Sequence, residues 1–404
     1  MSYKTVYEYY RDQEILPTCG SFKTLEELAR HGRSRERLFV EKLQLPPRLF
    51  RGADLIEFGP DSGENALIFA QWGAHCTLVE PNGQALPFIR NYFDGYGLAQ
   101  GLVGLEQSSI EEYAHSDKPK RQYDFVIAEG FLYTIKPASL WMDLASRLLK
   151  QDGFFVFYFL GVSGCFFDLF LKAVYSRVKK LTGLSPIETS RFIFQAKWDS
   201  ITHVRTLESW TMDMMENPFI RLPNFYDTRD LCQGLRACGL APYSSWPPFK
   251  DGLDAYWHKN QLPTDEMARR QETFLDHSRL SFFFGRTLFG HEPVPRSLIE
   301  DILATTDRLV DKFSPEDSHA LQEQLRDLSR FIGDRDTYGD PLDREAAVNS
   351  LEATIRLLQL LWEGEPDRIA AFCGVDKSFI NMWGMPTHYM VFTKQPAIPL
   401  QVPL

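Results

Sequence analysis

Four residues that could do chemistry stand close together in the stretch LIEFGPDSGENALIFA, residues 55–70: Glu57, Gly59, Asp61 and Gly63. An apolar strand, a glycine turn and a helix in this order form the element that binds nucleotides in open α/β sheets. A turn that binds pyrophosphate has glycine at its second conserved position, where this sequence has Asp61. Asp61 and the following Glu64 place negative charge where phosphates would lie, so the turn disfavours a phosphate-bearing ligand.

A further acidic residue, Glu80, ends the next apolar stretch about twenty residues later. In dinucleotide folds, an acid at this place accepts hydrogen bonds from ribose hydroxyls. The acidic turn and Glu80 together indicate a nucleoside without phosphates, preferably one that carries positive charge. S-adenosylmethionine meets this description because it joins adenosine to a cationic sulfonium and an α-amino group.

These residues resemble the class I S-adenosylmethionine-dependent methyltransferases, whose first motif runs acidic-x-Gly-x-Gly-x-Gly. Glu57, Gly59 and Gly63 match the motif, whereas Asp61 departs from it at the middle glycine. Glu80 matches the acidic residue of that family that binds both ribose hydroxyls. The resemblance covers roughly residues 53–160 and returns at 227–246.

The resemblance also implies which residues bind the cofactor. Ser108, Ser109 and Ile110 fall where the family contacts adenine, although serines at a strand end also satisfy turns. Glu129 follows the fourth strand and either contacts the methionine amino group, lines the acceptor cavity or caps the next turn. The full set of expected cofactor-binding residues is Glu57, Gly59, Asp61, Gly63, Asn65, Glu80, Pro81, Ser108, Ser109, Ile110, Glu129 and Gly130.

Strands that alternate with helices predict an α/β fold with a doubly wound, mostly parallel sheet, because the strands are apolar along nearly their whole length. The expected strands are residues 53–59, 75–82, 101–109, 123–130, 153–160, 240–246 and 388–395. The resemblance implies a seven-stranded Rossmann-like sheet whose last strand is antiparallel, with an additional helical region.

The chain of 404 residues is long enough for two domains or for one domain with large insertions. We expect an N-terminal helical segment at 1–50 and a methyltransferase domain at 51–250 with an insertion at 161–226. A helical insertion or lid at 251–386 and a final strand and tail at 387–404 follow. Two insertions on the active-site rim suggest an enclosed acceptor pocket. The alternative last strand is 254–260, which would leave a separate helical domain, but 389–392 is more apolar.

Methyl transfer to oxygen or nitrogen benefits from a base that removes a proton, and histidine is suited to this near neutral pH. His388 at the start of the last strand is the first candidate, and His203 is the second. Tyr133, beyond the fourth strand, could orient the acceptor, and core packing is an equal alternative. The histidines lack metal-ligand spacing, so no metal site is expected and a metal-dependent mechanism is disfavoured.

A formal net charge of −10 disfavours a nucleic-acid partner. Six dispersed cysteines and a polar N-terminus indicate a reducing, cytoplasmic setting. The apolar run 154–174 is interrupted by glycine and serine, so it is not expected to cross a membrane. The helix near 165–183 carries Lys172, Arg177, Lys179 and Lys180 and could lie on an anionic membrane, although a lid or packing role is favoured.

The sequence therefore predicts an S-adenosylmethionine-dependent methyltransferase that acts on a small molecule, at a hydroxyl or amine of a sugar or secondary metabolite. Two alternatives remain open: a nicotinamide-dependent oxidoreductase of Rossmann type, and a non-catalytic methyltransferase-like binding protein. Binding of nicotinamide cofactors would require phosphates to be tolerated beside Asp61.

Overall fold

A computed structural model describes residues 3–16, 24–116, 121–201, 206–249, 264–290, 292–333 and 339–394. The chain divides into two compact units. Unit 1 comprises residues 1–159, 228–249 and 388–404, and unit 2 comprises residues 160–227 and 250–387. The segment boundaries expected from the sequence stay predictions, and the alternative strand at 254–260 lies outside the described residues.

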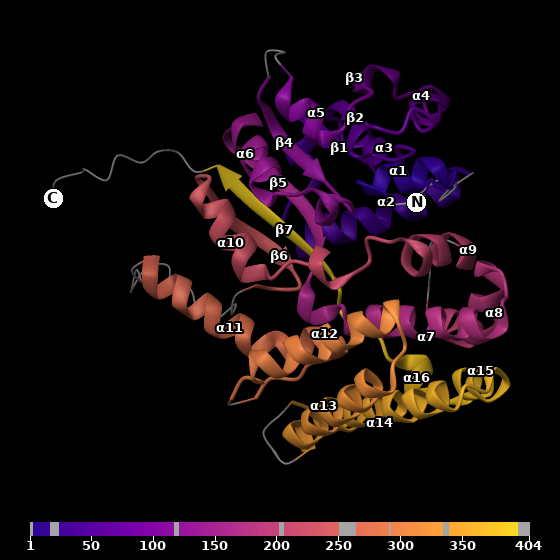
Figure 1. Ribbon diagram of the computed structural model, residues 1–404. Helices are drawn as coiled ribbons and strands as arrows, with labels where there is room; N and C mark the ends of the chain where they lie inside the picture. The colour runs from indigo at the N-terminus through magenta and orange to yellow at the C-terminus, as the bar shows by residue number, and fades with distance from the viewer. Residues whose placement is uncertain are drawn as a thin grey trace. The chain divides into compact units, whose positions relative to one another are not determined.

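A seven-stranded sheet in the order β3-β2-β1-β4-β5-β7-β6 organises unit 1 (Figure 1). Its strands are β1 Asp54–Phe58, β2 His75–Val79, β3 Leu102–Glu106, β4 Tyr123–Ala128, β5 Leu149–Leu160, β6 Leu240–Trp246 and β7 Thr387–Lys394. The pairs β1–β2, β1–β4, β2–β3 and β4–β5 are parallel. The pair β6–β7 is antiparallel, with Val391 opposite Ser244. The predicted α/β fold with a mostly parallel, seven-stranded sheet is confirmed.

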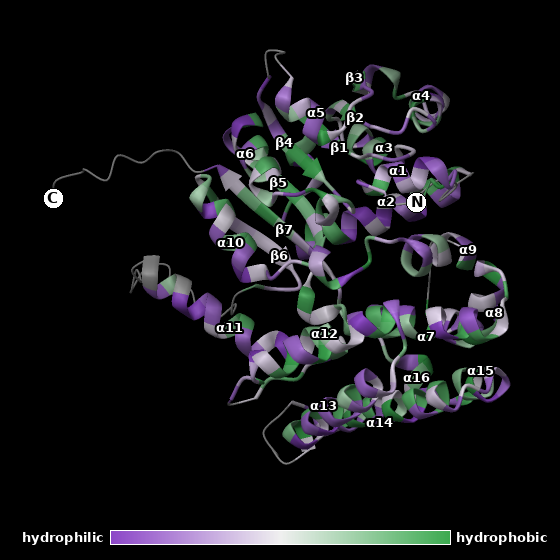
Figure 2. Cartoon of the chain, in the orientation of Figure 1, coloured by the Kyte–Doolittle hydropathy of each residue, from purple (hydrophilic) through white to green (hydrophobic). Residues whose placement is uncertain are grey.

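Helices cover both faces of this sheet, as expected for strands that are buried on both sides. They are α1 Val6–Asp12, α2 Leu25–Glu36, α3 Glu64–Gln71, α4 Leu86–Gly95, α5 Ile110–His115, α6 Ala138–Leu148 and α10 Thr228–Ala237. Short π or 3-10 turns lie at η1 Arg37–Lys42, η2 Pro47–Phe50, η3 Ala99–Gly101 and η4 Leu132–Thr134. The central strands are hydrophobic, whereas the helices carry both hydrophobic and hydrophilic residues (Figure 2).

An aromatic cluster forms much of the core on the α2 and α3 side of the sheet. Phe50 stacks on Phe125 with ring centroids 4.2 Å apart and on Phe69 with centroids 5.4 Å apart. Phe39 packs edge-on against Phe50 and Phe69. Because Phe39 follows directly on α2, this cluster anchors that helix, which supplies an arginine to the site described below.

Unit 2 is helical and is built from two separate parts of the chain. After β5 come η5 Val162–Gly164, α7 Phe166–Thr182, α8 Pro186–Asp199, α9 Leu207–Trp210, η6 Thr211–Glu216 and η7 Leu222–Asn224. After β6 come α11 Thr264–Phe284, α12 Arg296–Asp311, α13 Pro315–Gly333, α14 Pro341–Glu363, α15 Pro366–Val375 and α16 Lys377–Asn381. Lys197 on α8 joins the two parts, because its buried ammonium donates to the carbonyls of Phe379 at 2.9 Å and Met382 at 2.5 Å.

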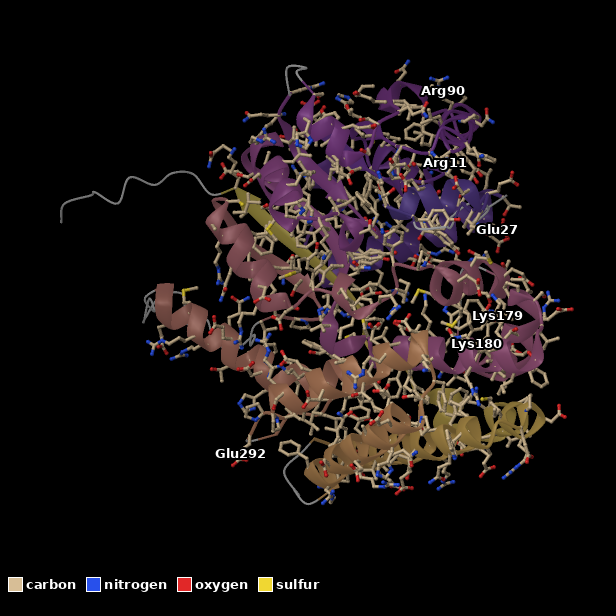
Figure 3. All side chains as sticks on the ribbon, viewed as in Figure 1. Arg11, Glu27, Arg90, Lys179, Lys180 and Glu292 are labelled. Carbon is tan, nitrogen blue, oxygen red and sulfur yellow. The ribbon has the colours of Figure 1, made fainter. Side chains whose placement is uncertain are left out.

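Helix α7 contains the basic apolar segment that could have lain on a membrane. Most of its side chains are buried within unit 2, Lys172 among them. Lys179 pairs with Glu216 at 2.6 Å, and Lys180 donates to the Asp311 carbonyl at 2.9 Å; Figure 3 labels both lysines. Within the described ranges, no helix has the length and apolar character needed to cross a bilayer.

Candidate functional site

The glycine turn after β1 contains three left-handed residues, all within unit 1. Their φ angles are +63° at Gly59, +52° at Asp61 and +95° at Gly63. A Cβ atom on Gly59 would lie 2.9 Å from the ring of Phe131, so a larger residue would not fit there. Asp61 holds the left-handed conformation because aspartate tolerates it better than most non-glycine residues. The turn therefore has left-handed residues at all three motif positions, and the middle one is acidic.

Glu80, the first residue after β2, holds this turn through its carboxyl group. Its Oε2 atom accepts the N–H of Asp61 at 3.0 Å, and its Oε1 atom accepts the N–H of Asn82 at 2.7 Å. The side chain is 4% exposed, and burial raises the pKa of Glu80 to about 8 against the lowering effect of the N–H groups. Pro81 lies between Glu80 and Asn82 in the chain. Glu80 thus joins the ends of β1 and β2.

Two more buried carboxyl groups flank the turn. Glu57, in β1, is 2% exposed, and its Oε2 atom has no hydrogen-bond partner among the residues that the structure describes. Burial and the nearby Glu129 raise the pKa of Glu57 to about 8. Glu64, at the start of α3, accepts from the hydroxyls of Ser62 at 2.5 Å and Tyr92 at 3.3 Å, and burial raises its pKa to about 7. Acidic groups therefore surround the turn.

A buried ion pair lies beyond the turn, between α2 and the loop after β4. Arg35 donates from Nη1 to Oε2 of Glu129 at 2.9 Å and from Nη2 to Oε1 at 2.6 Å. Both side chains are 7% exposed. The hydroxyl of Tyr389, on β7, donates to the same Oε2 atom at 3.1 Å. The next residue, Gly130, has a φ of +88° and packs against the ring of Tyr158.

Sequence reasoning missed Arg35, and one signal could have found it. Helix α2 carries several arginines, but only Arg35 stands seven residues after the buried Leu28 and four before the buried Phe39. This spacing places all three on one helix face, which here is the buried face. The Arg35 guanidinium lies over the rings of Phe39 and Phe69, at 4.9 and 5.3 Å from their centroids. An arginine within an apolar stripe indicates a buried partner of opposite charge.

The expected residue Asn65 contacts the same N-terminal helix. Its Oδ1 atom lies 3.1 Å from Nε2 of His31, a residue of α2. Burial and the positive charge of Arg35 lower the pKa of His31, so the imidazole is neutral at pH 7. Helix α2 is therefore attached to α3 through His31 and to the loop after β4 through Arg35.

The expected adenine-contacting residues lie at the start of α5. The Ser109 hydroxyl accepts the N–H of Glu112 at 3.1 Å, and the Glu112 carboxylate accepts the N–H of Ser109 at 2.9 Å, which completes a capping box. The Ser108 hydroxyl donates to the Ser109 carbonyl at 3.1 Å, and Ile110 is 6% exposed. Both hydroxyls thus satisfy local backbone groups, and contact with adenine stays a prediction.

Two of the three candidate catalytic residues, His388 and Tyr133, are buried. His388, on β7, is 4% exposed, and its ring centroid lies 5.4 Å from that of Phe159. Tyr133 is 2% exposed within η4. His203 lies outside the described residues. Their catalytic roles stay predictions. In the described part of the chain, no three His, Cys, Asp or Glu side chains are arranged to hold a metal, and five cysteines, Cys76, Cys165, Cys232, Cys238 and Cys373, are free thiols.

Comparisons with known proteins find several that are similar to this chain. Residues 29–245 match the family model of a methyltransferase domain, while no curated protein matches the sequence. A putative sarcosine dimethylglycine methyltransferase from Galdieria sulphuraria is 11% identical, with a TM-score of 0.37, over 90% of this chain and 86% of that one. The [4+2]-cyclase SpnF is also 11% identical, with a TM-score of 0.36, over 90% and 80% of the two chains.

A third similar structure is the CcbJ methyltransferase from Streptomyces caelestis. It is 20% identical, with a TM-score of 0.30, over 40% of this chain and 61% of that one. At such identities, likeness to solved structures concerns the fold alone. The family-model match is the stronger finding, because it covers more than half of the chain and includes the glycine turn, Glu80 and Glu129. The chain therefore belongs to the family of methyltransferase-domain proteins.

Proposed function

We propose that this protein is an S-adenosylmethionine-dependent methyltransferase of a small-molecule acceptor, a hydroxyl or amine of a sugar or secondary metabolite. The observation that carries the cofactor proposal is the left-handed acidic turn, in which Asp61 stands at the middle glycine position of the motif and has a φ of +52°. The carboxyl groups of Glu57, Glu64 and Glu80 are buried around this turn. A nearby cation stabilises the ionised form of these carboxyl groups and pyrophosphate opposes it, so such surroundings favour a cationic nucleoside over pyrophosphate.

The residues present fit S-adenosylmethionine at its nucleoside end. Each carboxylate oxygen of Glu80 already accepts one backbone N–H, and each has further lone-pair capacity for a ribose hydroxyl. Gly59 and Gly63 keep side chains out of the turn, so that the backbone can approach the ligand. Ile110 and the backbone near Ser109 are proposed to contact adenine.

The Arg35–Glu129 pair fits the amino-acid end. A methionine group carries one ammonium and one carboxylate, and the pair presents one guanidinium and one carboxylate. The Nε atom of Arg35 is buried without a hydrogen-bond partner in the described residues, so the guanidinium has a donor left for a ligand carboxylate. Glu129 would correspondingly accept from the ammonium. When bound, the cofactor supplies an electrophilic methyl group.

The acceptor side of the proposal rests on charge and on residue type. A net charge of −10 disfavours nucleic acid as the acceptor. His388 is proposed as the base that takes the acceptor proton, with Tyr133 as an orienting residue. Alignment of the acceptor would itself contribute to the rate, so His388 need not be strongly basic. The small number of cysteines favours the reducing cytoplasm as the working compartment.

Calorimetric titration of the full chain tests the cofactor assignment. We expect saturable binding of S-adenosylmethionine and S-adenosylhomocysteine and no binding of NAD(P). A Glu80→Gln variant should weaken both adenosyl ligands at least tenfold, because it replaces an acceptor carboxylate at the ribose position with an amide. Binding of NAD(P) without binding of either adenosyl ligand would instead assign the protein to the nicotinamide oxidoreductases.

Transfer of a labelled methyl group to hydroxyl- and amine-bearing small molecules tests the proposed acceptor class and the proposed role of His388. With an acceptor identified, His388→Asn should lower turnover while the affinity for the cofactor is kept, and undiminished turnover would remove His388 from the mechanism. Cofactor binding without transfer to any acceptor of these classes would favour the non-catalytic binding protein.

A further inference from the structure

Glu57 differs from the other carboxyl groups around the glycine turn. Its Oε2 atom is buried and has no hydrogen-bond partner in the described chain, whereas Glu80 uses both of its oxygens for backbone N–H groups. Three charged groups face it: Glu129 and Glu80, which repel its negative charge, and Arg35, which attracts it. The neighbouring Cys76 is a neutral thiol, because burial raises its pKa. Glu57 is therefore the carboxyl group here with the least compensation for a negative charge.

The charges near Glu57 balance when Glu57 and Glu80 are both neutral. Arg35 and Glu129 neutralise each other through two hydrogen bonds. An ionised Glu57 would add one uncompensated negative charge in a buried place. Burial and Glu129 accordingly raise its pKa to about 8, so its carboxyl group holds a proton at pH 7 in the ligand-free protein.

We propose that Glu57 is a specificity-determining residue that distinguishes the cofactor from its product by charge. It releases its proton to solvent when the sulfonium cation of S-adenosylmethionine binds, and it keeps the proton when the neutral thioether of S-adenosylhomocysteine binds. This inference rests on the proposed function of the same site. It predicts that rising pH favours the cofactor over the product.

A comparison of S-adenosylmethionine with S-adenosylhomocysteine isolates the contribution of Glu57 to ligand selection. Both carry adenosine and a zwitterionic amino-acid end, so Glu80 and the Arg35–Glu129 pair respond alike to both. The ligands differ by one positive charge at sulfur. In a buried site an added cation stabilises an ionised carboxylate. Burial also raises the pKa values of Glu64 and Glu80, but their oxygens already accept from Ser62, Tyr92 and backbone N–H groups. Glu57 combines a proton to release with a buried oxygen that has no hydrogen-bond partner in the described residues.

Calorimetry of the full chain, in two buffers of different ionisation enthalpy, counts the protons released. At pH 7 we expect S-adenosylmethionine to release about one more proton than S-adenosylhomocysteine. The ratio of their affinities should rise about tenfold per pH unit from pH 6 to pH 8 and level off above the Glu57 pKa of about 8. An analogue with an ammonium-bearing carbon in place of sulfur should behave like the cofactor.

Two isosteric variants sharpen the test. Glu57→Gln cannot release a proton, so the difference in proton count should vanish and the affinity ratio should no longer change with pH. Glu64→Gln is the matched control, because Glu64 is equally buried but its oxygens accept from Ser62 and Tyr92. This control should keep the difference of about one proton, since the same Glu57 remains ionisable.

The outcomes separate this inference from the proposed function. Equal proton counts for both ligands in the unaltered protein would overturn the inference while the cofactor assignment stands. A difference that persists in Glu57→Gln would overturn it as well. Failure of both adenosyl ligands to bind would overturn the proposed function itself. If Glu57→Gln does not fold, the two-ligand comparison on the unaltered chain still decides.

Discussion

Removal of the Arg35 guanidinium should destabilise unit 1 more than the loss of any exposed ion pair. The variant Arg35→Met keeps the apolar stem that packs on Phe39 and Phe69 but leaves Glu129 without its cation. Glu129 is 7% exposed, so the remaining carboxylate would be buried, with the Tyr389 hydroxyl as its hydrogen-bond partner among the residues that the structure describes. A buried charge that loses its partner is costly, because water cannot replace the lost interaction.

The two contacts of 2.9 and 2.6 Å set the magnitude. Opposite unit charges about 4 Å apart attract by about 4 kcal/mol at an effective dielectric constant of 20. Removing one member of a buried pair typically costs about 3–5 kcal/mol. We therefore expect Arg35→Met to lower the free energy of unfolding of unit 1 by about 3–4 kcal/mol. The double variant Arg35→Met with Glu129→Gln should recover most of this loss, since no buried charge is left unpaired.

Hydrogen–deuterium exchange of the β1 and β4 amides measures the free energy of unfolding of unit 1 separately from that of unit 2. The exposed pair Arg37–Glu41, 4.0 Å apart, supplies the control, and Arg37→Met should cost less than about 0.5 kcal/mol. Additive effects of Arg35→Met and Glu129→Gln within about 0.5 kcal/mol would refute the reasoning. Such a result would mean that the pair is screened as if it lay on the surface.

Three further outcomes are expected. Folded Glu57 and Glu80 keep their protons up to about pH 8, while the unfolded carboxyls ionise near pH 4.3, so unit 1 should lose stability as pH rises between these values. Urea unfolding from pH 5 to pH 8 measures this loss. If Glu57→Gln left the slope of unfolding free energy against pH unchanged, the prediction would be contradicted. Asp61→Gly and its exposed control Asp152→Gly both relieve a left-handed aspartate, so both should be neutral or stabilising by up to about 1 kcal/mol. In competitive titration, only Asp61→Gly should weaken the selection against NAD(P). Equal selection against NAD(P) in the two variants would exclude a role for the Asp61 charge. Lys197→Met removes the ammonium that joins the two parts of unit 2 and should destabilise that unit by about 2–4 kcal/mol. Faster amide exchange in α16 would show this loss. Unchanged exchange in α16 would disprove the joining role of Lys197.

The order of the strands in the chain followed from the sequence because buried parallel strands carry a strong local signal. The expected strand 123–130 and the observed β4, Tyr123–Ala128, differ only at one end. Within the helical segment expected at 1–50, α2 is followed by the π turn Arg37–Lys42, a change of hydrogen bonding that leaves no mark in the apolar pattern. β5 begins at Leu149, four residues before the expected start, since its first part includes a left-handed Asp152 that reads as a turn.

The candidate site was predictable only where its contacts lie within one motif. Asp61 in the glycine turn and Glu80 are nineteen residues apart in the chain, and family-like spacing was enough to join them. Arg35 and Glu129 are 94 residues apart, and Tyr389 and Glu129 are 260 apart. A contact across such separations depends on how helix α2 and strand β7 pack onto the sheet. No local pattern determines that packing, so the partners of Glu129 appeared only in the structure.

The conformation at Asp61 explains how aspartate, in place of the middle glycine of the motif, changes both the charge and the hydrogen bonding of the turn. In a dinucleotide-binding turn, backbone N–H groups face the pyrophosphate and glycine leaves room for it. Here the N–H of Asp61 instead donates to the Glu80 carboxylate at 3.0 Å, which removes one donor from any phosphate. Aspartate accepts the φ of +52° at a cost of about 1–2 kcal/mol, whereas a β-branched residue would not. The turn therefore combines three left-handed residues with an acidic side chain and an N–H group that already donates to Glu80, and both features disfavour phosphate.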